Sequence, residues 1–228
     1  MGDNRETARA ACDARRIGDF DAMCTTTIVG DVRLAFWSVV DLERHVDREA
    51  LLRVGDSPEP PYWAYCWSGA RVLAERIPHD PGRVVEIGCG LGLPGLVAAR
   101  RGARVVFVDR VATPLAFVRA SLDANALDAT GLVVADLLQP AWRGCFDLVL
   151  AAEVLYDRAA FIPMVAAMRA MLAPGGVILL ADGHRIDSAA FYERAERDGL
   201  EVAREDVRVH EEGFPATVSL VTMRMATP

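Results

Sequence analysis

The chain has 228 residues, of which 52% are hydrophobic and 25% are charged, and its formal net charge at pH 7 is −7. This length and composition suit one domain with a full core and an N-terminal extension. The acidic balance argues against a nucleic-acid partner, because binding to a phosphate backbone depends on clustered basic residues. No lysine occurs among the 25 basic residues, which excludes Walker-type phosphate loops and lysine Schiff-base chemistry.

The five cysteines are odd in number and show no C-x-x-C spacing, so we expect reduced thiols rather than a disulfide framework or a zinc site. No apolar run has the length of a membrane span, and the first residues lack the apolar core of a signal peptide. We therefore expect a cytoplasmic protein that binds no metal, no membrane and no nucleic acid. The composition leaves the oligomeric state open.

Residues 1–61 are expected to form an N-terminal extension that covers part of a ligand site. Its first part is polar and rich in Ala and Arg, two β-branched runs flank a Gly-Asp turn, and an acid-capped periodic run precedes a proline-rich stretch. These patterns predict a helix within 1–21, a hairpin of 25–29 and 32–40, a helix over 41–52 and a loop over 55–61.

Residues 62–228 are expected to form the main domain, because apolar strand-like runs alternate there with helical patterns. Such alternation predicts an α/β fold, with a parallel sheet covered by helices on both faces. The expected strands are 84–87, 105–108, 132–135, 146–152 and 177–181, followed by two β-rich segments, 200–210 and 217–224. The expected helices are 62–77, 96–101, 113–126, 159–172 and 188–198.

The stretch 83–109 combines a strand, a glycine turn, a helix and a second strand that ends on Asp109. Glycines let a backbone turn sharply and approach a ligand, and an acid at the next strand tip can accept hydrogen bonds from ribose hydroxyls. The stretch therefore predicts a nucleoside-binding site.

Two glycine patterns fit this stretch. The dinucleotide fingerprint G-x-G-x-x-G begins at Gly90, whereas the pattern E-x-G-x-G-x-G of S-adenosylmethionine (SAM) dependent methyltransferases begins at Glu86. The strand ends by Ile87, so the first turn glycine is Gly88, and Pro94 suits the first turn of the following helix. Position relative to the strand favours the SAM pattern, and dinucleotide binding is kept as an alternative.

From about Tyr62 onward, the order of elements resembles the class I, seven-β-strand SAM-dependent methyltransferases. This resemblance implies a Rossmann-like, doubly wound, mostly parallel seven-stranded sheet with an antiparallel C-terminal hairpin strand. The chain is similar to the branch of protein lysine methyltransferases that includes the electron-transfer-flavoprotein β-subunit enzymes. Three features carry the similarity: Trp67-Ser68-Gly69, the loop 86–92 and Glu153-x-x-Tyr156. The branch usually has Pro where Ser68 stands and Asp where Glu153 stands.

The resemblance implies a set of SAM-binding residues. They are Trp67, Glu86, Gly88, Cys89, Gly90, Gly92, Asp109, Arg110, Asp136, Leu137 and Ala152. The glycines are expected to hold the methionine and ribose portion, Asp109 the ribose hydroxyls, and Asp136 with Leu137 the adenine amino group. Both aspartates also suit the capping of turns, which is the structural alternative.

Glu153 and Tyr156 come directly after the fourth strand of the domain and are the expected catalytic pair. Open parallel sheets bring ligands to the carboxyl ends of their strands, so both side chains should face the transferred methyl group. Because SAM carries its own leaving group, the transfer needs mainly alignment and a dry site, without a metal or a covalent nucleophile. The alternative is that Glu153 caps a turn and Tyr156 packs. His184 also stands at a strand tip, although a solvated loop position suits it as well.

These inferences predict a SAM-dependent N-methyltransferase that acts on a protein side chain, lysine above all, and releases S-adenosylhomocysteine (SAH). A lysine with a pKa of about 10.4 arrives protonated, and a carboxylate such as Glu153 can hold its ammonium group. The alternatives are a small-molecule N- or O-methyltransferase, a non-catalytic SAM-binding module and an NAD-dependent oxidoreductase. The Pro-Pro-aromatic motif of N6-adenine methyltransferases is absent after the fourth strand, which argues against a base substrate.

Overall fold

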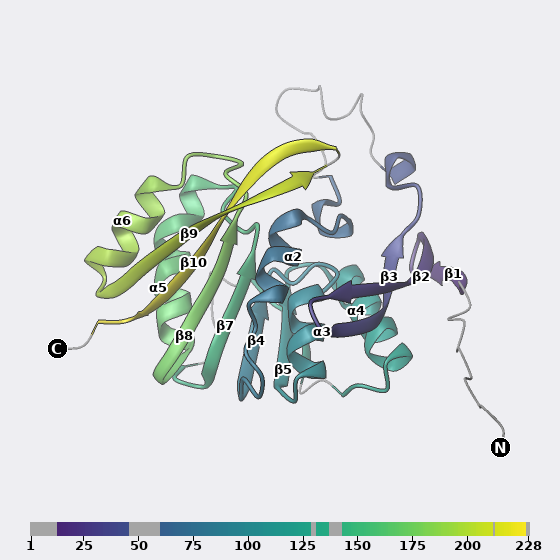
Figure 1. The fold of residues 1–228 in the computed structure, drawn as a ribbon, viewed down its shortest axis with the longest axis horizontal. Helices are drawn as coiled ribbons and strands as arrows, with labels where there is room; N and C mark the ends of the chain where they lie inside the picture. The colour runs from purple at the N-terminus through teal and green to yellow at the C-terminus, as the bar shows by residue number, and fades with distance from the viewer. Residues whose placement is uncertain (1–12, 46–59, 129–130, 137–142, 212, 227–228) are drawn as a thin grey trace, which may run out of the picture.

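The computed structural model describes residues 13–45, 60–128, 131–136, 143–211 and 213–226. These residues form a seven-stranded sheet flanked by helices and a separate three-stranded sheet, as Figure 1 shows.

The large sheet has the strand order β6-β5-β4-β7-β8-β10-β9. Its strands are β4 (Arg83–Ile87), β5 (Arg104–Asp109), β6 (Gly131–Val134), β7 (Phe146–Ala152), β8 (Leu172–Asp182), β9 (Leu200–Glu211) and β10 (Phe214–Met225). The strands from β6 to β8 are parallel, whereas β10 runs antiparallel to both β8 and β9. This arrangement confirms the expected Rossmann-like fold class.

Helices cover both faces of the large sheet. They are α2 (Ser68–Glu75), α3 (Leu93–Arg100), α4 (Ala112–Ala124), α5 (Phe161–Met171) and α6 (Ala189–Arg197). Alternate residues of β4 separate the two cores: Val84 packs with α2, α3 and α4, whereas Val85 packs with α5 and α6. Because side chains of a strand point alternately to opposite faces, nearly continuous apolar runs such as Phe146–Ala152 contribute to both cores at once.

The N-terminal segment is β-structure where the sequence predicted a helix. β1 (Ala14–Ile17), β2 (Phe20–Val29) and β3 (Val32–Val39) form an antiparallel sheet, so the helix expected within 1–21 is wrong for residues 14–21. A turn at Gly18 and Asp19 interrupts any helix and reverses the chain. The hairpin expected around Gly30-Asp31 is confirmed, with Val29 paired to Val32.

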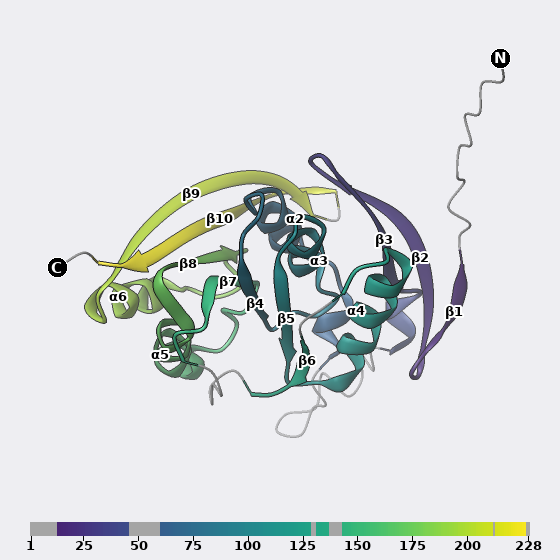
Figure 2. The same ribbon diagram turned by 90° about the horizontal axis from the view of Figure 1, so that it is seen from below.

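This small sheet packs on the outside of α4, as Figure 2 shows. Backbone N–H groups of β3 donate hydrogen bonds to side chains of α4 and of its C-cap residue. Trp37 N donates to Ser121 Oγ at 3.0 Å, and Ala35 N donates to Asn125 Oδ1 at 2.9 Å. Asn125 Nδ2 donates back to the Ala35 carbonyl oxygen at 2.6 Å. The sheet is therefore joined to the helical layer by polar as well as apolar contacts.

Two further expected helices are only partly as predicted or only partly described. Of the helix expected over 41–52, the described residues Leu42–His45 form a 3-10 helix, and residues 46–52 lie outside the described part of the chain. The helix expected over 62–77 is divided into a 3-10 turn, Tyr62–Ala64, and α2. Tyr65 and Trp67 have extended backbones between them, and their rings pack edge to face at 4.4 Å. The break turns this aromatic segment toward the carboxyl ends of the strands.

Candidate methyltransferase site

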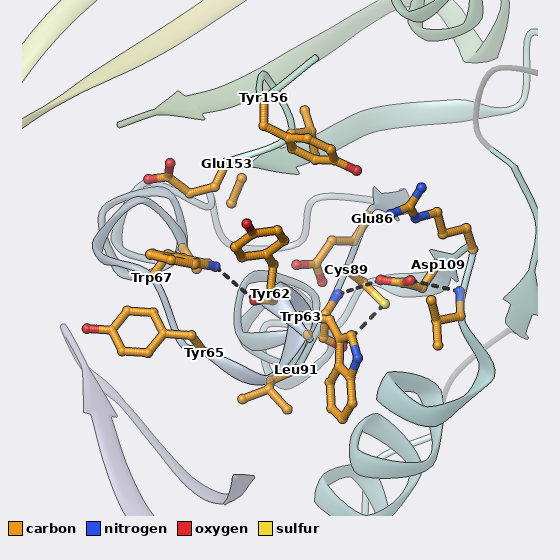
Figure 3. Close-up of a pocket in the computed structure, with 18 of the residues that line it drawn as sticks. Tyr62, Trp63, Tyr65, Trp67, Glu86, Cys89, Leu91, Asp109, Glu153 and Tyr156 are labelled. Carbon is orange, nitrogen blue, oxygen red and sulfur yellow. Dashed lines mark hydrogen bonds between the residues drawn. The ribbon is translucent and has the colours of Figure 1, made fainter. Parts of the chain in front are cut away.

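A cavity of about 830 Å³ opens at the carboxyl ends of β4, β5 and β7 (Figure 3). This volume lies within the range of about 300–1,000 Å³ that is typical of small-molecule sites. The cavity brings together most of the residues that the sequence analysis selected: Trp67, Glu86, Gly88, Cys89, Gly90, Gly92, Asp109, Arg110, Asp136, Ala152, Glu153 and Tyr156. Leu137, the remaining selected residue, lies outside the described residues.

The glycine loop between β4 and α3 follows a path that side chains would obstruct. Gly88, Gly90 and Gly92 have φ values of 58°, 50° and 75°, in the left-handed region that favours glycine. A Cβ atom on Gly90 would lie 3.0 Å from the Trp63 carbonyl oxygen, and one on Gly92 would lie 2.7 Å from Val118 Cγ2. The loop therefore exposes backbone along one wall of the cavity.

Glu86 lies beneath this loop and fixes the start of α3. Glu86 is 2% exposed, and its Oε2 accepts a hydrogen bond of 2.8 Å from Gly95 N. Burial raises the pKa of Glu86 to about 8, with a smaller contribution from the Asp109 carboxylate, while the Gly95 bond opposes the rise. Glu86 thus satisfies an amide that the first turn of a helix leaves without an intrahelical partner.

The same contact bears on the choice between the two glycine patterns. A pyrophosphate binds the N-terminus of a helix through its unpaired N–H groups. At the start of α3, Pro94 has no N–H and the Gly95 N–H already bonds Glu86. The helix terminus therefore offers a pyrophosphate few donors and a buried acid nearby, which favours the SAM pattern.

Asp109 ends β5 beside the glycine loop and is 7% exposed. Its Oδ2 accepts a hydrogen bond from Gly90 N and its Oδ1 accepts one from Val111 N, each at 3.0 Å. Burial raises the pKa of Asp109, and these backbone bonds oppose the rise. The two bonds hold the carboxylate at the cavity wall, where its remaining lone pairs can accept hydrogen bonds from a ligand.

The far end of the cavity holds Glu153 and Tyr156. Glu153 has a φ of 57°, and its side chain is 5% exposed, whereas Tyr156 is half exposed. The Glu153 carboxylate accepts hydrogen bonds of 3.2 Å from Gly183 N and from Arg185 Nε. Figure 3 shows this carboxylate turned toward Trp67 and away from Tyr156. Burial raises the pKa of Glu153, and the Arg185 guanidinium opposes the rise.

Several lining residues were absent from the set that the sequence analysis selected. The Trp63 ring packs edge to face against the Phe20 ring at 5.0 Å between centroids, and Trp63 also lines the cavity. Arg185 lies on the loop after β8 and lines the cavity. Its position at the tip of a strand could have indicated this role, but the sequence analysis selected its neighbour His184 for that position. His184 Nε2 lies 2.9 Å from Ser219 Oγ.

The described residues offer neither a metal centre nor a membrane-spanning helix. No group of three or more His, Cys, Asp or Glu residues in the described ranges is arranged to hold a metal ion. Within the same ranges, the helices are all too short or too polar to cross a membrane.

Residues 85–180, from β4 into β8, match the family model described as a methyltransferase domain. Over this range the chain is similar to methyltransferase domains. The fold agrees with a solved structure, a TehB-like SAM-dependent methyltransferase from Corynebacterium glutamicum, with a TM-score of 0.55 and 20% identity over 71% of this chain and 89% of that one.

Curated proteins that are similar to this chain fall into different substrate classes. The chain is 32% identical over 146 residues to protein N-lysine methyltransferase METTL21A of Danio rerio, covering 59% of this chain and 64% of the relative. It is also 32% identical over 117 residues to a ubiquinone biosynthesis O-methyltransferase of Cereibacter sphaeroides, covering 50% and 47%. The chain thus spans less than two thirds of the length of each of these relatives.

Class I methyltransferases take their methyl group from SAM, so SAM is the cofactor that this domain implies. The described residues fit such a group. Three glycines in left-handed conformations leave a wall without side chains, and the Asp109 carboxylate lies directly beside it. Asp136, which is exposed at the cavity rim after β6, adds a second polar group on the same side.

Proposed function

We propose that the protein transfers the methyl group of SAM to the side-chain nitrogen of a lysine in a protein substrate. The observation that carries this proposal is that one cavity joins two chemically different ends. One end has the glycine loop and Asp109, which suit a nucleoside, and the other has Trp67, Glu153 and Tyr156, which suit a cation. The similarity to a protein N-lysine methyltransferase supports the same conclusion.

In this proposal the loop and the strand tips hold the cofactor. Gly88, Gly90 and Gly92 face its methionine and ribose portion, and Asp109 accepts hydrogen bonds from the ribose hydroxyls. Asp136 takes the adenine end at the rim. The remaining contacts come from Trp67, Glu86, Cys89, Arg110 and Ala152, which line the same cavity, and from Leu137.

The residues at the acceptor end prepare the lysine for attack. When bound, SAM supplies an activated methyl group and its own leaving group. The ionised carboxylate of Glu153 attracts the lysine ammonium, and its raised pKa reduces the difference in proton affinity between the two groups. Tyr156 at the rim limits the directions from which the nitrogen can approach. The wall of the cavity excludes water and fixes the alignment.

The proposal is tested by incubating the purified protein with methyl-labelled SAM and a cell lysate, then examining proteins and metabolites separately. The expected result is label on lysine side chains of one or a few proteins. The matched control is a Glu153→Gln variant, which should still bind SAM and should transfer little label. Label confined to small metabolites would refute the protein substrate.

A small-molecule methyltransferase is the second candidate. The similarity to a ubiquinone biosynthesis O-methyltransferase supports it, and so does the lining of the cavity by Pro60 and Pro61, which precede α2. Residues 1–61 would then act as an extension that closes over a small acceptor. The metabolite fraction of the same experiment tests this candidate directly.

A further inference from the structure

The side chain of Arg185 is enclosed by three groups that favour a cation. Its guanidinium carbon lies 3.5 Å from the centroid of the Trp67 ring. Its Nε donates to Glu153 Oε2 at 3.2 Å, and a terminal nitrogen lies 3.8 Å from Glu211 Oε2. An aromatic face and two carboxylates together form a strong environment for any organic cation. We call these three residues, Trp67, Glu153 and Glu211, the cation site.

The cation site is built from fixed elements of the fold. Gly69 and Gly183 make room for the Glu153 carboxylate, because a Cβ atom on either would lie 2.3 Å or 2.6 Å from Oε1. Glu211 at the end of β9 accepts a hydrogen bond of 3.2 Å from Ser68 N at the start of α2. Trp67 Nε1 donates to the Tyr62 carbonyl oxygen at 3.0 Å, so each of the three groups has a contact that does not involve Arg185.

Arg185 itself is attached differently. It lies in the loop between β8 and α6, outside any helix or strand, and its side chain is 33% exposed, against 5% for Glu153. A long side chain on a loop can leave such a position by rotation about its own bonds, with its charge entering solvent. Because a guanidinium stays charged at all ordinary pH values, the cation site is occupied whenever the side chain is folded back.

We propose that Arg185 occupies the binding site of the acceptor's ammonium group and that the acceptor binds by displacing it. This inference rests on the proposed function, and it adds that Arg185 is a specificity-determining residue. The tethered guanidinium competes at a high effective concentration. Only an acceptor that brings its own cation restores the contacts with Trp67, Glu153 and Glu211, so neutral and anionic acceptors are disfavoured.

The first test uses n-butylammonium as a probe of the lysine side chain, with binding measured by calorimetry in the presence of SAH. An Arg185→Gln variant removes the competing cation, while the Gln amide can still donate a hydrogen bond to Glu153. This variant is expected to bind the probe at least about tenfold more tightly than the wild-type protein. Arg185→Lys should bind the probe as weakly as the wild-type protein. Equal or weaker binding in Arg185→Gln would overturn the proposal.

Matched controls separate this effect from a general loss of positive charge. Arg158 pairs with Asp187 at 3.5 Å and lies outside the cation site, so Arg158→Gln should leave probe binding unchanged. Neutral n-butanol, which cannot replace the contacts of the guanidinium, should bind both proteins more weakly than n-butylammonium does. A double variant, Arg185→Gln with Glu153→Gln, should lose the gain; retention of the gain would overturn the role of Glu153 as the competing partner.

A second measurement needs no arginine variant. Displacement of Arg185 replaces the guanidinium at the Trp67 ring by an alkylammonium group. Saturating n-butylammonium should therefore change the tryptophan fluorescence of the wild-type protein and leave that of Trp67→Phe unchanged. Identical responses in both proteins would contradict displacement. Failure of the proposed function would show separately, as absent SAM binding or absent methyl transfer, because neither probe measurement requires turnover.

With an active acceptor peptide, the kinetics give a third readout. Displacement predicts that Arg185→Gln lowers KM for the peptide while kcat changes little. A fall in kcat with an unchanged KM would instead make Arg185 a positioning residue for Glu153, and would overturn the proposal.

Discussion

The Glu86 carboxylate accepts a hydrogen bond of 2.8 Å from Gly95 N and thereby joins β4 to the first turn of α3 beneath the glycine loop. Gly95 is required for this contact, because a Cβ atom there would lie 2.5 Å from Glu86 Oε2 and 2.3 Å from Phe107 Cε1. The hydrogen bond between Glu86 and Gly95 therefore fixes the position of the glycine loop relative to β4 and α3.

A Glu86→Gln variant is expected to have a flatter dependence of unfolding free energy on pH. The pKa of Glu86 is raised from 4.5 to about 8 in the folded protein, so between these values the folded state retains a proton that the unfolded chain has lost. Stability present at low pH therefore decreases as pH rises toward 8, by at most about 1.4 kcal/mol per pH unit for one proton. Urea unfolding across this range measures the difference; parallel curves for the two proteins would contradict it.

An Asp109→Ala variant is expected to bind SAM about 10- to 100-fold more weakly, the loss that corresponds to one or two charge-assisted hydrogen bonds. The fold should persist, because the bonds lost from Asp109 join loop amides at the cavity wall. Calorimetry with SAH measures the affinity. Asp123→Asn serves as a control, since Asp123 pairs with Arg119 and both side chains of this α4 pair are exposed. Binding of NADH with no binding of SAM would reverse the choice of cofactor.

A Gly90→Ala variant is expected to lose cofactor affinity by more than its loss of stability explains. The new Cβ would lie 3.0 Å from the Trp63 carbonyl oxygen, and the φ of 50° is unfavourable for alanine by roughly 1–3 kcal/mol. Gly102→Ala is the matched control, because Gly102 also has a positive φ and its Cβ would meet no atom within 4 Å. Thermal unfolding of both variants measures the backbone strain, and calorimetry with SAH measures the loss of cofactor binding. Equal SAH affinities of the two variants would contradict a role of Gly90 in cofactor binding.

A Glu153→Ala variant is expected to lose methyl transfer by about 10²- to 10⁴-fold, with SAM binding retained, if the carboxylate holds and deprotonates the acceptor. Because burial raises the pKa of Glu153, activity in the wild-type protein should start to fall on acidification above the ordinary pKa of 4.5. The pH profile of single-turnover methyl transfer checks both statements. Unchanged turnover in the variant would leave Glu153 as a structural group alone.

Local patterns in the sequence predicted the sheet well and the N-terminal region poorly. Runs such as 146–152 are apolar at every position except Asp147 because both faces of the strand are buried, and that property is readable one residue at a time. The segment 14–21 has no comparable signal, and its strands form only because β2 and β3 pair and pack on α4. The break at Tyr65 to Trp67 likewise depends on packing between rings.

The sequence by itself determined the α/β order and the glycine loop with its acid at the tip of β5, because periodicity and turn chemistry are local properties of neighbouring residues. Only the tertiary structure decided what surrounds the acceptor end. Ser68 and Glu211 bond across 143 positions of the chain, and Glu153 and Arg185 bond across 32. These residues come together only where distant strands and loops meet at one edge of the sheet. The sequence therefore singled out Trp67 and Glu153 separately, and only the tertiary structure placed them with Glu211 around Arg185.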